Sequence, residues 1–141
     1  MTELIVEAKL DNLAQVLQFV DSRLEEEDCP IGLQMKIDVA VEELFVNIAS
    51  YAYTPGSGSA AVRMEVEEDP KTVVITFVDH GVPYDPLAKE DPDVTLSLKD
   101  REIGGLGIFM VKKSMDDMTY AYENGQNVLT IRKRIGADPA G

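Results

Sequence analysis

The sequence predicts an α/β (α+β) two-layer sandwich, with two or three helices on one face of a mixed, mostly antiparallel sheet. Three observations lead to this fold class. A short strand pattern is followed by two apolar stripes at helical spacing, two strand patterns stand in the middle of the chain, and a hairpin pattern lies near its end. The 141 residues suffice for one domain with a core and are too few for two. We expect this domain to span residues 1–135 and residues 136–141 to form a frayed tail.

The first half of the chain is predicted to contain one strand and two helices. Residues 3–9 have a strand pattern, and residues 12–26 have helical spacing, with Asp11 as the N-cap. A second helix is expected to start near Pro30, a residue type suited to the first turn of a helix. The sequence TPGSGS at 54–59 ends this helix, whose apolar stripe consists of Leu33, Ile37, Ala40, Val41, Leu44 and Ile48.

The second half is predicted to contain four strands and one helix. SAAVRMEVEE alternates between apolar and polar residues, which indicates a half-exposed strand, and KTVVITFV is nearly all apolar, which indicates a central strand. The polar stretch from 81 to 103 is long for a loop, as is typical of a functional lid. Glycines then open a helix that runs to about Ser114, and MTYAYENGQNVLTIRKRI predicts a hairpin around Asn124-Gly125.

Charge and composition exclude some classes of partner. A net charge of −13 disfavours binding to nucleic acid and to an anionic membrane surface, because both need a basic face. Cys29 is the only cysteine, so no internal disulfide is expected, which fits a reducing compartment. The sequence shows no signal-peptide pattern, and no apolar run approaches the roughly 18 residues of a membrane span. We therefore expect a cytoplasmic protein.

Glu43 and Asn47 form the first of three polar constellations, four residues apart on the second predicted helix. At about 100° per residue, each lies about 60° from a member of the apolar stripe, so both border the core-facing surface. An amide oxygen is a hard ligand that suits Mg²⁺, and a carboxylate one turn earlier could orient or deprotonate an attacking hydroxyl or water. A solvated helix edge would explain the same pair, and the neighbouring Glu42 is a second candidate carboxylate.

VDHGVPYDP, residues 78–86, is the second constellation. Asp79 ends the central strand, where a carboxylate can accept a hydrogen bond from an exocyclic amine such as the adenine amino group. Gly81 lets the backbone come close to a flat ring, and Pro83 stiffens the exit from the turn. The alternative is an ordinary turn after a strand.

REIGGLGIFMVKK, residues 101–113, is the third constellation. Gly104, Gly105 and Gly107 precede an amphipathic helix and leave amide N–H groups at its positive end, which can seat phosphate. Arg101 could add a charge-assisted contact. The stretch is not a Walker loop, since it has no G-K-[ST], and it does not follow a strand as a Rossmann fingerprint does. The alternative is a flexible, glycine-rich helix start.

In this order, the three constellations resemble the GHKL ATPase superfamily, with its Bergerat nucleotide-binding fold, and within it the small anti-sigma-factor serine/threonine kinases. The resemblance runs from about residue 31 to 135. It rests on E-x-x-x-N on a helix, on D-x-G-x-P-Y-D-P after a strand, and on GGLGIFMV followed by KKSMDD. The stretch through TIRKRI is similar to the C-terminal signature of this kinase branch.

The resemblance implies ATP and Mg²⁺ as cofactors and a role for each residue around the purine and the metal. Glu43 would be the general base and Asn47 the Mg²⁺ ligand. Asp79 would bind the adenine amino group with Gly81 beneath the ring, and Pro83 belongs to the same cofactor-binding motif.

The resemblance also implies roles on the phosphate side. Gly104, Gly105 and Gly107 would seat the phosphates. Residues 87–103 would form an ATP lid, with Arg101 as the lid arginine.

The implied function is an ATP-dependent protein serine/threonine kinase in a partner-switching circuit, whose partner is a sigma factor or an anti-sigma-factor antagonist. A homodimer built with the first strand and helix is expected by analogy with relatives. The alternative is a nucleotide-dependent interaction module without kinase activity, in which ATP only orders residues 87–103. The sequence departs from this branch at Tyr51, where His is frequent, and the sole histidine, His80, receives no role.

Overall fold

The computed structural model describes residues 1–53, 56–88 and 105–136. The strands are β1 (Thr2–Glu7), β2 (Ser59–Glu67), β3 (Thr72–Asp79), β4 (Asp117–Glu123) and β5 (Gln126–Arg134). The α-helices are α1 (Leu13–Glu26), α2 (Ile31–Asn47) and α3 (Gly105–Ser114). Three short turns of other helix types are η1 (Leu10–Asn12), η2 (Ile48–Ala52) and η3 (Pro86–Ala88).

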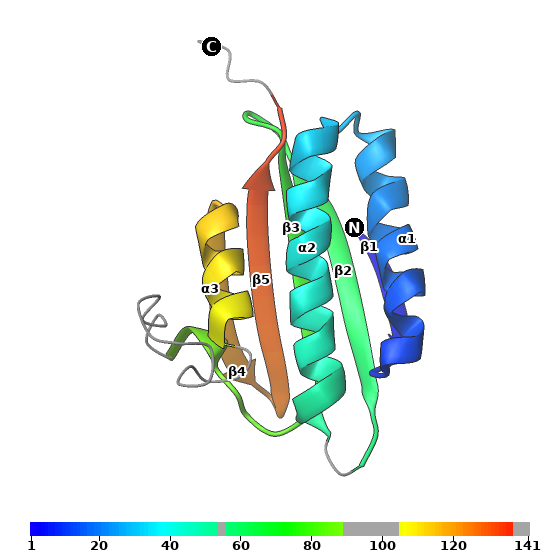
Figure 1. The fold of residues 1–141 in the computed structure, drawn as a ribbon, viewed down its shortest axis with the longest axis vertical. Helices are drawn as coiled ribbons and strands as arrows, with labels where there is room; N and C mark the ends of the chain where they lie inside the picture. Colours follow the sequence, from blue (N-terminus) through cyan, green and yellow to red (C-terminus); the bar gives the residue numbers. More distant parts are fainter. Residues whose placement is uncertain (54–55, 89–104, 137–141) are drawn as a thin grey trace.

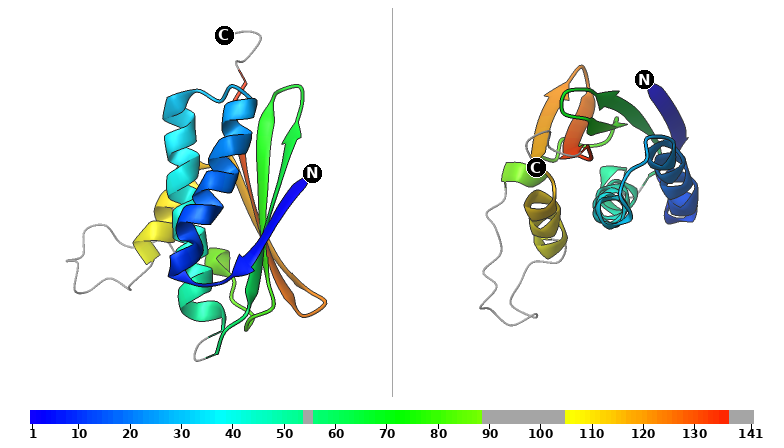
Figure 2. Two further views of the ribbon diagram at one scale, coloured as in Figure 1. Left: turned by 90° about the vertical axis from the view of Figure 1, so that its right-hand side faces the viewer. Right: turned by 90° about the horizontal axis from the view of Figure 1, so that it is seen from above.

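The five strands form one sheet in the order β1-β2-β3-β5-β4, with every neighbouring pair antiparallel. All three α-helices lie on the same face of this sheet, as Figures 1 and 2 show. The predicted two-layer fold is therefore confirmed, and its described strand pairs are antiparallel throughout rather than mixed. β3 is the central strand, as its apolar sequence predicts.

The core lies between the helices and the sheet. The predicted stripe of α2 is buried at Ile37, Ala40, Val41 and Leu44, because helical periodicity places these residues on the face toward the sheet. Other large, fully buried side chains are Val16, Val20, Leu24, Phe45, Val62, Met64, Ile75, Phe77 and Ile131. In the parts of the chain that the structure describes, no helix is long and apolar enough to cross a membrane.

The predicted N-cap at Asp11 is wrong. Asp11 lies inside the 3-10 turn η1, and α1 begins only at Leu13, after Asn12. Asn12 makes no capping bond, because its Nδ2 donates instead to the carbonyl oxygen of Glu7 at 2.9 Å. The side chain thus ties the end of β1 to the start of the helix.

The predicted hairpin between β4 and β5 is confirmed. Asn124 and Gly125 have φ values of 53° and 76°, as a two-residue hairpin loop of the primed type requires. This loop sets a register in which Asn127 of β5 lies opposite Tyr122 of β4. On the other side of β5, Asn127 lies opposite Asp79 of β3.

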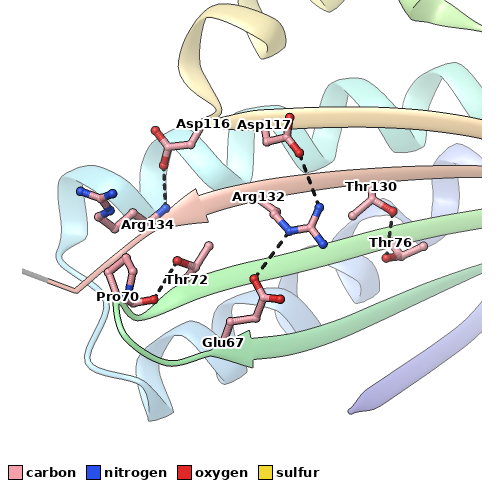
Figure 3. A network of polar contacts seen from close by, with 9 residues as sticks. All are labelled: Glu67, Pro70, Thr72, Thr76, Asp116, Asp117, Thr130, Arg132 and Arg134. Atoms are coloured by element: carbon pink, nitrogen blue, oxygen red, sulfur yellow. Dashed lines mark hydrogen bonds and ion pairs between the residues drawn. The ribbon is translucent and has the colours of Figure 1, made fainter.

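A polar network fixes the register near the other end of the strands (Figure 3). Arg132 of β5 forms ion pairs with Asp117 of β4 at 3.5 Å and with Glu67 of β2 at 3.6 Å, reaching over β3. The hydroxyls of Thr76 and Thr130 lie 3.2 Å apart on β3 and β5. Since one residue of slip would turn every side chain to the opposite face, these pairs help to keep the core face apolar.

Two carboxyl groups meet between α1 and α2. Asp38 of α2 lies beside Asp21 of α1, whose Oδ1 also accepts a hydrogen bond from Nε2 of Gln34 at 3.2 Å. Burial, a hydrogen bond with Asp21, and the charges of Asp21 and Glu25 raise the pKa of Asp38 from 3.8 to about 7. Within the described residues, Oδ1 of Asp38 is buried without a hydrogen-bond partner, so its ionised form is poorly compensated.

Asp38→Asn is expected to stabilise the protein at pH 8 and to have little effect near pH 4. Because the pKa of Asp38 is raised in the folded state, the folded protein binds a proton more tightly than the unfolded chain between these pH values. The free energy of unfolding of the parent therefore falls as the pH rises toward about 7 and then levels off. Asp38 is only partly buried, so the gain at pH 8 is on the order of 1 kcal/mol.

Urea unfolding at several pH values measures this effect. Asp11→Asn, which removes the same charge at an exposed position, is the control. An equal gain from Asp38→Asn at pH 4 and pH 8 would contradict the prediction.

Candidate functional site

A pocket opens where the C-terminal end of α2 meets the ends of β3 and β5. Its empty volume is about 640 Å³, including space open to solvent. Three polar side chains, those of Asn47, Asp79 and Asn127, reach this pocket. The remaining lining is apolar or aromatic and consists of Leu44, Ile48, Tyr51, Ala52, Phe77, Val82, Pro83, Tyr84, Pro86, Tyr120 and Leu129.

Asp79, the last residue of β3, places a buried carboxylate in the wall of this pocket. It is 5% exposed. Its Oδ1 accepts hydrogen bonds at 2.9 Å from the backbone N–H of Gly81 and from Nδ2 of Asn127. Among the described residues, both side-chain hydrogen bonds of Asp79 end on Oδ1, so Oδ2 keeps its acceptor capacity for a ligand amine.

Asn127 of β5 fixes both the carboxylate and the chain that follows it. Its Nδ2 donates to Oδ1 of Asp79 and to the carbonyl oxygen of Val82, each at 2.9 Å. Its Oδ1 accepts from the backbone N–H of Tyr84 at 3.1 Å and from the hydroxyl of Tyr120. Burial raises the pKa of Tyr120, which keeps this hydroxyl protonated as a donor. A buried amide with partners at both ends holds the site in one arrangement.

Asn47, the last residue of α2, lines the pocket next to a single π-helical turn, η2. Such turns within helices are frequent at functional sites. This turn brings the carbonyl oxygen of Ala52 within 3.1 Å of the backbone N–H of Val82. A Cβ on Gly81 would stand 2.6 Å from the carbonyl carbon of Ala52, so the segment after β3 can approach η2 only with glycine at this position.

The two tyrosines after the Asn47 helix have different surroundings. The hydroxyl of Tyr53 accepts from the backbone N–H of His80 at 2.7 Å and donates to the carbonyl oxygen of Ser59 at 2.6 Å, and burial raises its pKa. Tyr51 is 51% exposed and lines the pocket. Tyr53 therefore holds the strand ends together, whereas Tyr51 is available to a ligand.

Glu43 lies one helical turn before Asn47 and faces the start of α3. It is half-buried, and a Cβ on Gly107 would stand 2.9 Å from its Cδ and closer still to its Oε2. The neighbouring Glu42 is exposed. Of the two candidate carboxylates, Glu43 is thus the one that the fold directs toward the glycine-rich helix start.

The other predicted site residues are only partly within the described ranges. Pro83 is exposed and lines the pocket, and Gly105 is the first residue of α3. Arg101 and Gly104 lie outside the described residues. So does the predicted lid, except for residues 87–88 at the end of η3.

Sequence reasoning missed Asn127 and its partner Tyr120. A signal for Asn127 was present in β5, where residues 127, 129 and 131 share the buried face. A polar residue at one position of this apolar face has to find buried partners. The sequence could not show that these partners include Asp79, because the two residues are 48 positions apart.

The donor set of the pocket fits a purine nucleotide. An apolar slot with one buried carboxylate suits a flat heterocycle that carries an exocyclic amine. Within the described residues, no group of three or more His, Cys, Asp or Glu is placed to hold a metal ion. A Mg²⁺ ion at Asn47 would take its other ligands from phosphate oxygens and water, which is its usual manner of binding.

Comparison with models of protein families matches residues 6–133 to the histidine kinase-like ATPase domain. The chain belongs to this family. The match includes α2, β3, α3 and β5, the elements that carry the site. It confirms the predicted resemblance to the GHKL-type ATPases.

Two relatives with similar sequences are protein kinases. The serine/threonine-protein kinase BtrW of Bordetella bronchiseptica is 30% identical over 99 residues, which cover 70% of this chain and 69% of BtrW. The serine-protein kinase RsbW of Bacillus cereus is 27% identical over 98 residues, which cover 67% of this chain and 60% of that RsbW. These similarities confirm the predicted branch of the ATPase family. The chain matches less than two thirds of the length of this RsbW.

Two solved structures share the fold. The RsbU and RsbW domains of Rv1364c from Mycobacterium tuberculosis align with a TM-score of 0.63 and 15% identity, over 98% of this chain and 34% of that one. The SiaB-SiaC complex from Pseudomonas aeruginosa contains a chain that aligns with a TM-score of 0.56 and 15% identity, over 92% of this chain and 88% of that one. At this identity the comparison establishes the fold of the ATPase domain and no more.

Asn127→Ala is expected to lower the free energy of unfolding by about 2–3 kcal/mol, because it leaves partners on three segments, among them the buried Asp79, without their hydrogen bonds. The matched control is Gln126→Ala, next to it in β5. This control removes one hydrogen bond, from Nε2 of Gln126 to Nε2 of the exposed His80, and is expected to cost less than about 1 kcal/mol. Urea unfolding of both variants measures the difference. Equal losses of unfolding free energy would show that the hydrogen bonds of Asn127 stabilise the fold no more than the single bond of Gln126.

Proposed function

We propose that the chain is an ATP-binding protein serine/threonine kinase of the anti-sigma-factor type, which transfers the γ-phosphate of ATP to a serine or threonine of a protein partner. One observation carries this proposal. The buried carboxylate of Asp79, in an otherwise apolar pocket, shares that pocket with Asn47, and Glu43 stands one helical turn earlier. The kinase relatives support the same function.

The purine end of the proposed site depends on Asp79. Its Oδ2 is assigned to accept a hydrogen bond from the adenine amino group, while Asn127 and the N–H of Gly81 hold Oδ1. Apolar side chains such as Phe77 and Leu129 exclude water around the ring, which strengthens this bond. Pro83 borders the same space.

The phosphate end depends on Glu43, Asn47 and the start of α3. ATP, when bound with Mg²⁺, supplies the phosphoryl group that is transferred. Asn47 would contribute a neutral oxygen ligand to the metal, and the N–H groups of Gly105 and Gly107 at the positive end of α3 are assigned to the phosphates. We assign the same role to Gly104 and Arg101 from the sequence motif alone.

Glu43 is assigned as the general base. It takes the proton from the partner's hydroxyl as the oxygen of that hydroxyl bonds to the γ-phosphorus, and the bond to the leaving ADP breaks. Little covalent chemistry is needed from the protein beyond this proton transfer, because positioning and charge neutralisation supply most of the acceleration.

The proposed partners are a sigma factor or an anti-sigma-factor antagonist in a partner-switching circuit, as the resemblance to the anti-sigma-factor kinases implies; the similarity to the serine-protein kinase RsbW supports a protein partner. A cytoplasmic location and a homodimer built with β1 and α1 belong to the same proposal.

Asp79→Asn is expected to weaken ATP binding about 10- to 100-fold, because the amine loses a charged acceptor and the partners of Oδ1 must rearrange. Asp117→Asn makes the same chemical change in the polar network at the other end of the sheet and should leave the affinity unchanged. Calorimetric titration with Mg-ATP compares the two variants. Parental affinity in Asp79→Asn would place the nucleotide elsewhere.

Glu43→Ala is expected to bind ATP within about threefold of the parent and to transfer phosphate at least about 100-fold more slowly, the usual contribution of a general base. Radiolabelled γ-phosphate incubated with candidate antagonist proteins measures the transfer. Glu42→Ala, at the exposed neighbour, should transfer at the parental rate. Transfer at the parental rate by Glu43→Ala would remove the base assignment. A parent protein that binds ATP tightly but labels no partner would instead be a nucleotide-dependent interaction module.

A further inference from the structure

The carboxylate of Glu43 lies in the space that a side chain at position 107 would fill. Among the described residues, the three atoms nearest to an ideal Cβ built on Gly107 all belong to the Glu43 side chain: Cδ at 2.9 Å, Oε1 at 3.5 Å, and Oε2 closer than either. Gly107 thus provides the surface against which this carboxylate rests.

The backbone of α3 is held in place at this point. Ile108 and Val111, on the same helix, are buried in the core at 6% and 1% exposure. Because these side chains fix the helix against the sheet, a methyl group at position 107 would not move the helix away. The Glu43 side chain, which is flexible and only half-buried, would move instead.

The surroundings of Gly107 differ from those of the other helical and motif glycines. A Cβ on Gly32, in α2, would meet nothing within 4 Å. A Cβ on Gly81 would collide with the backbone of Ala52, which cannot rotate away. Of these three, only Gly107 has a candidate catalytic side chain as its neighbour.

We propose that Gly107 is a positioning residue for Glu43: the absence of a side chain at position 107 lets the carboxylate lie against the first turn of α3, beside the amide groups assigned to the phosphates. The positive end of the helix attracts the carboxylate and favours this location. The inference rests on the proposed role of Glu43 and gives this glycine a function besides seating phosphate.

The first test is a crystal structure of Gly107→Ala. The Glu43 carboxylate is expected to lie at least about 1 Å from its parental position, with the hydrogen bonds between Asp79 and Asn127 unchanged, because the added methyl group takes its place. This readout does not depend on enzymatic activity. A carboxylate in its parental position would overturn the inference even if the chain is a kinase.

The second test is kinetic and uses Mg-ATP without a partner, so that water replaces the partner's hydroxyl as the acceptor of the γ-phosphate, and the release of ADP is the signal. A displacement of about 1 Å can cost about 100-fold, so we expect kcat of Gly107→Ala to fall by about that factor while the Kd for ATP changes less than about threefold. Gly32→Ala, the same substitution in open space, should change neither value. If the affinity for ATP and kcat fall by the same factor, Gly107 acts only by binding the phosphates, and the inference is overturned.

A double variant supplies the control for indirect effects. Glu43→Asp shortens the side chain by one methylene and withdraws it from the space beside position 107. Gly107→Ala should therefore lower turnover less than about threefold in the Glu43→Asp background, since the two changes act on one contact. Two full, independent losses would overturn the inference. If Glu43→Ala turns over ATP at the parental rate, the base assignment fails, and the crystallographic test still decides whether Gly107 sets the position of Glu43.

Discussion

The candidate site depends on one hydrogen bond, in which Nδ2 of Asn127 donates to Oδ1 of Asp79 between the central strand β3 and its neighbour β5. A carboxylate that is 5% exposed needs hydrogen bonds, because burial without them costs several kcal/mol. In the described part of the chain, the donors that meet this need are amide groups rather than cations. Both of these donors reach Oδ1, so the second carboxylate oxygen, Oδ2, is left to accept a hydrogen bond from a ligand.

The same amide also determines the path of the chain after β3. Further hydrogen bonds of this amide join it to the carbonyl oxygens of Gly81 and Val82, the N–H of Tyr84 and the hydroxyl of Tyr120. One side chain thus connects the carboxylate to the wall of the pocket, so a movement of either disturbs the hydrogen bonds of the other. The network at the other end of the sheet keeps the strands in register and so keeps Asn127 opposite Asp79 (Figure 3).

The sequence was informative wherever a single element decides the geometry. Helical periodicity was enough to place Glu43 and Asn47 at the edge of the buried stripe of α2, and an apolar run ending in an acid was enough to place Asp79 at the end of a central strand. It failed where a local alternative competed, as when Asn12 bonded back to Glu7 and the helix began after Asp11. It gave no indication of the role of Asn127, because that residue meets Asp79, 48 positions earlier in the chain, only when β3 and β5 are paired in register.

The glycines of the two motifs show why a motif does not by itself state a mechanism. Gly81 is required because the carbonyl group of Ala52 occupies the space of its side chain, and backbone at that point cannot yield. Gly107 faces the carboxylate end of the flexible Glu43 side chain. A side chain at position 107 would displace this carboxylate, at little cost in stability. The first glycine is therefore needed for the fold to close around the pocket, and the second for the position of a charged group beside it. A ligand is not the only reason for either glycine, although both belong to segments that border the proposed nucleotide.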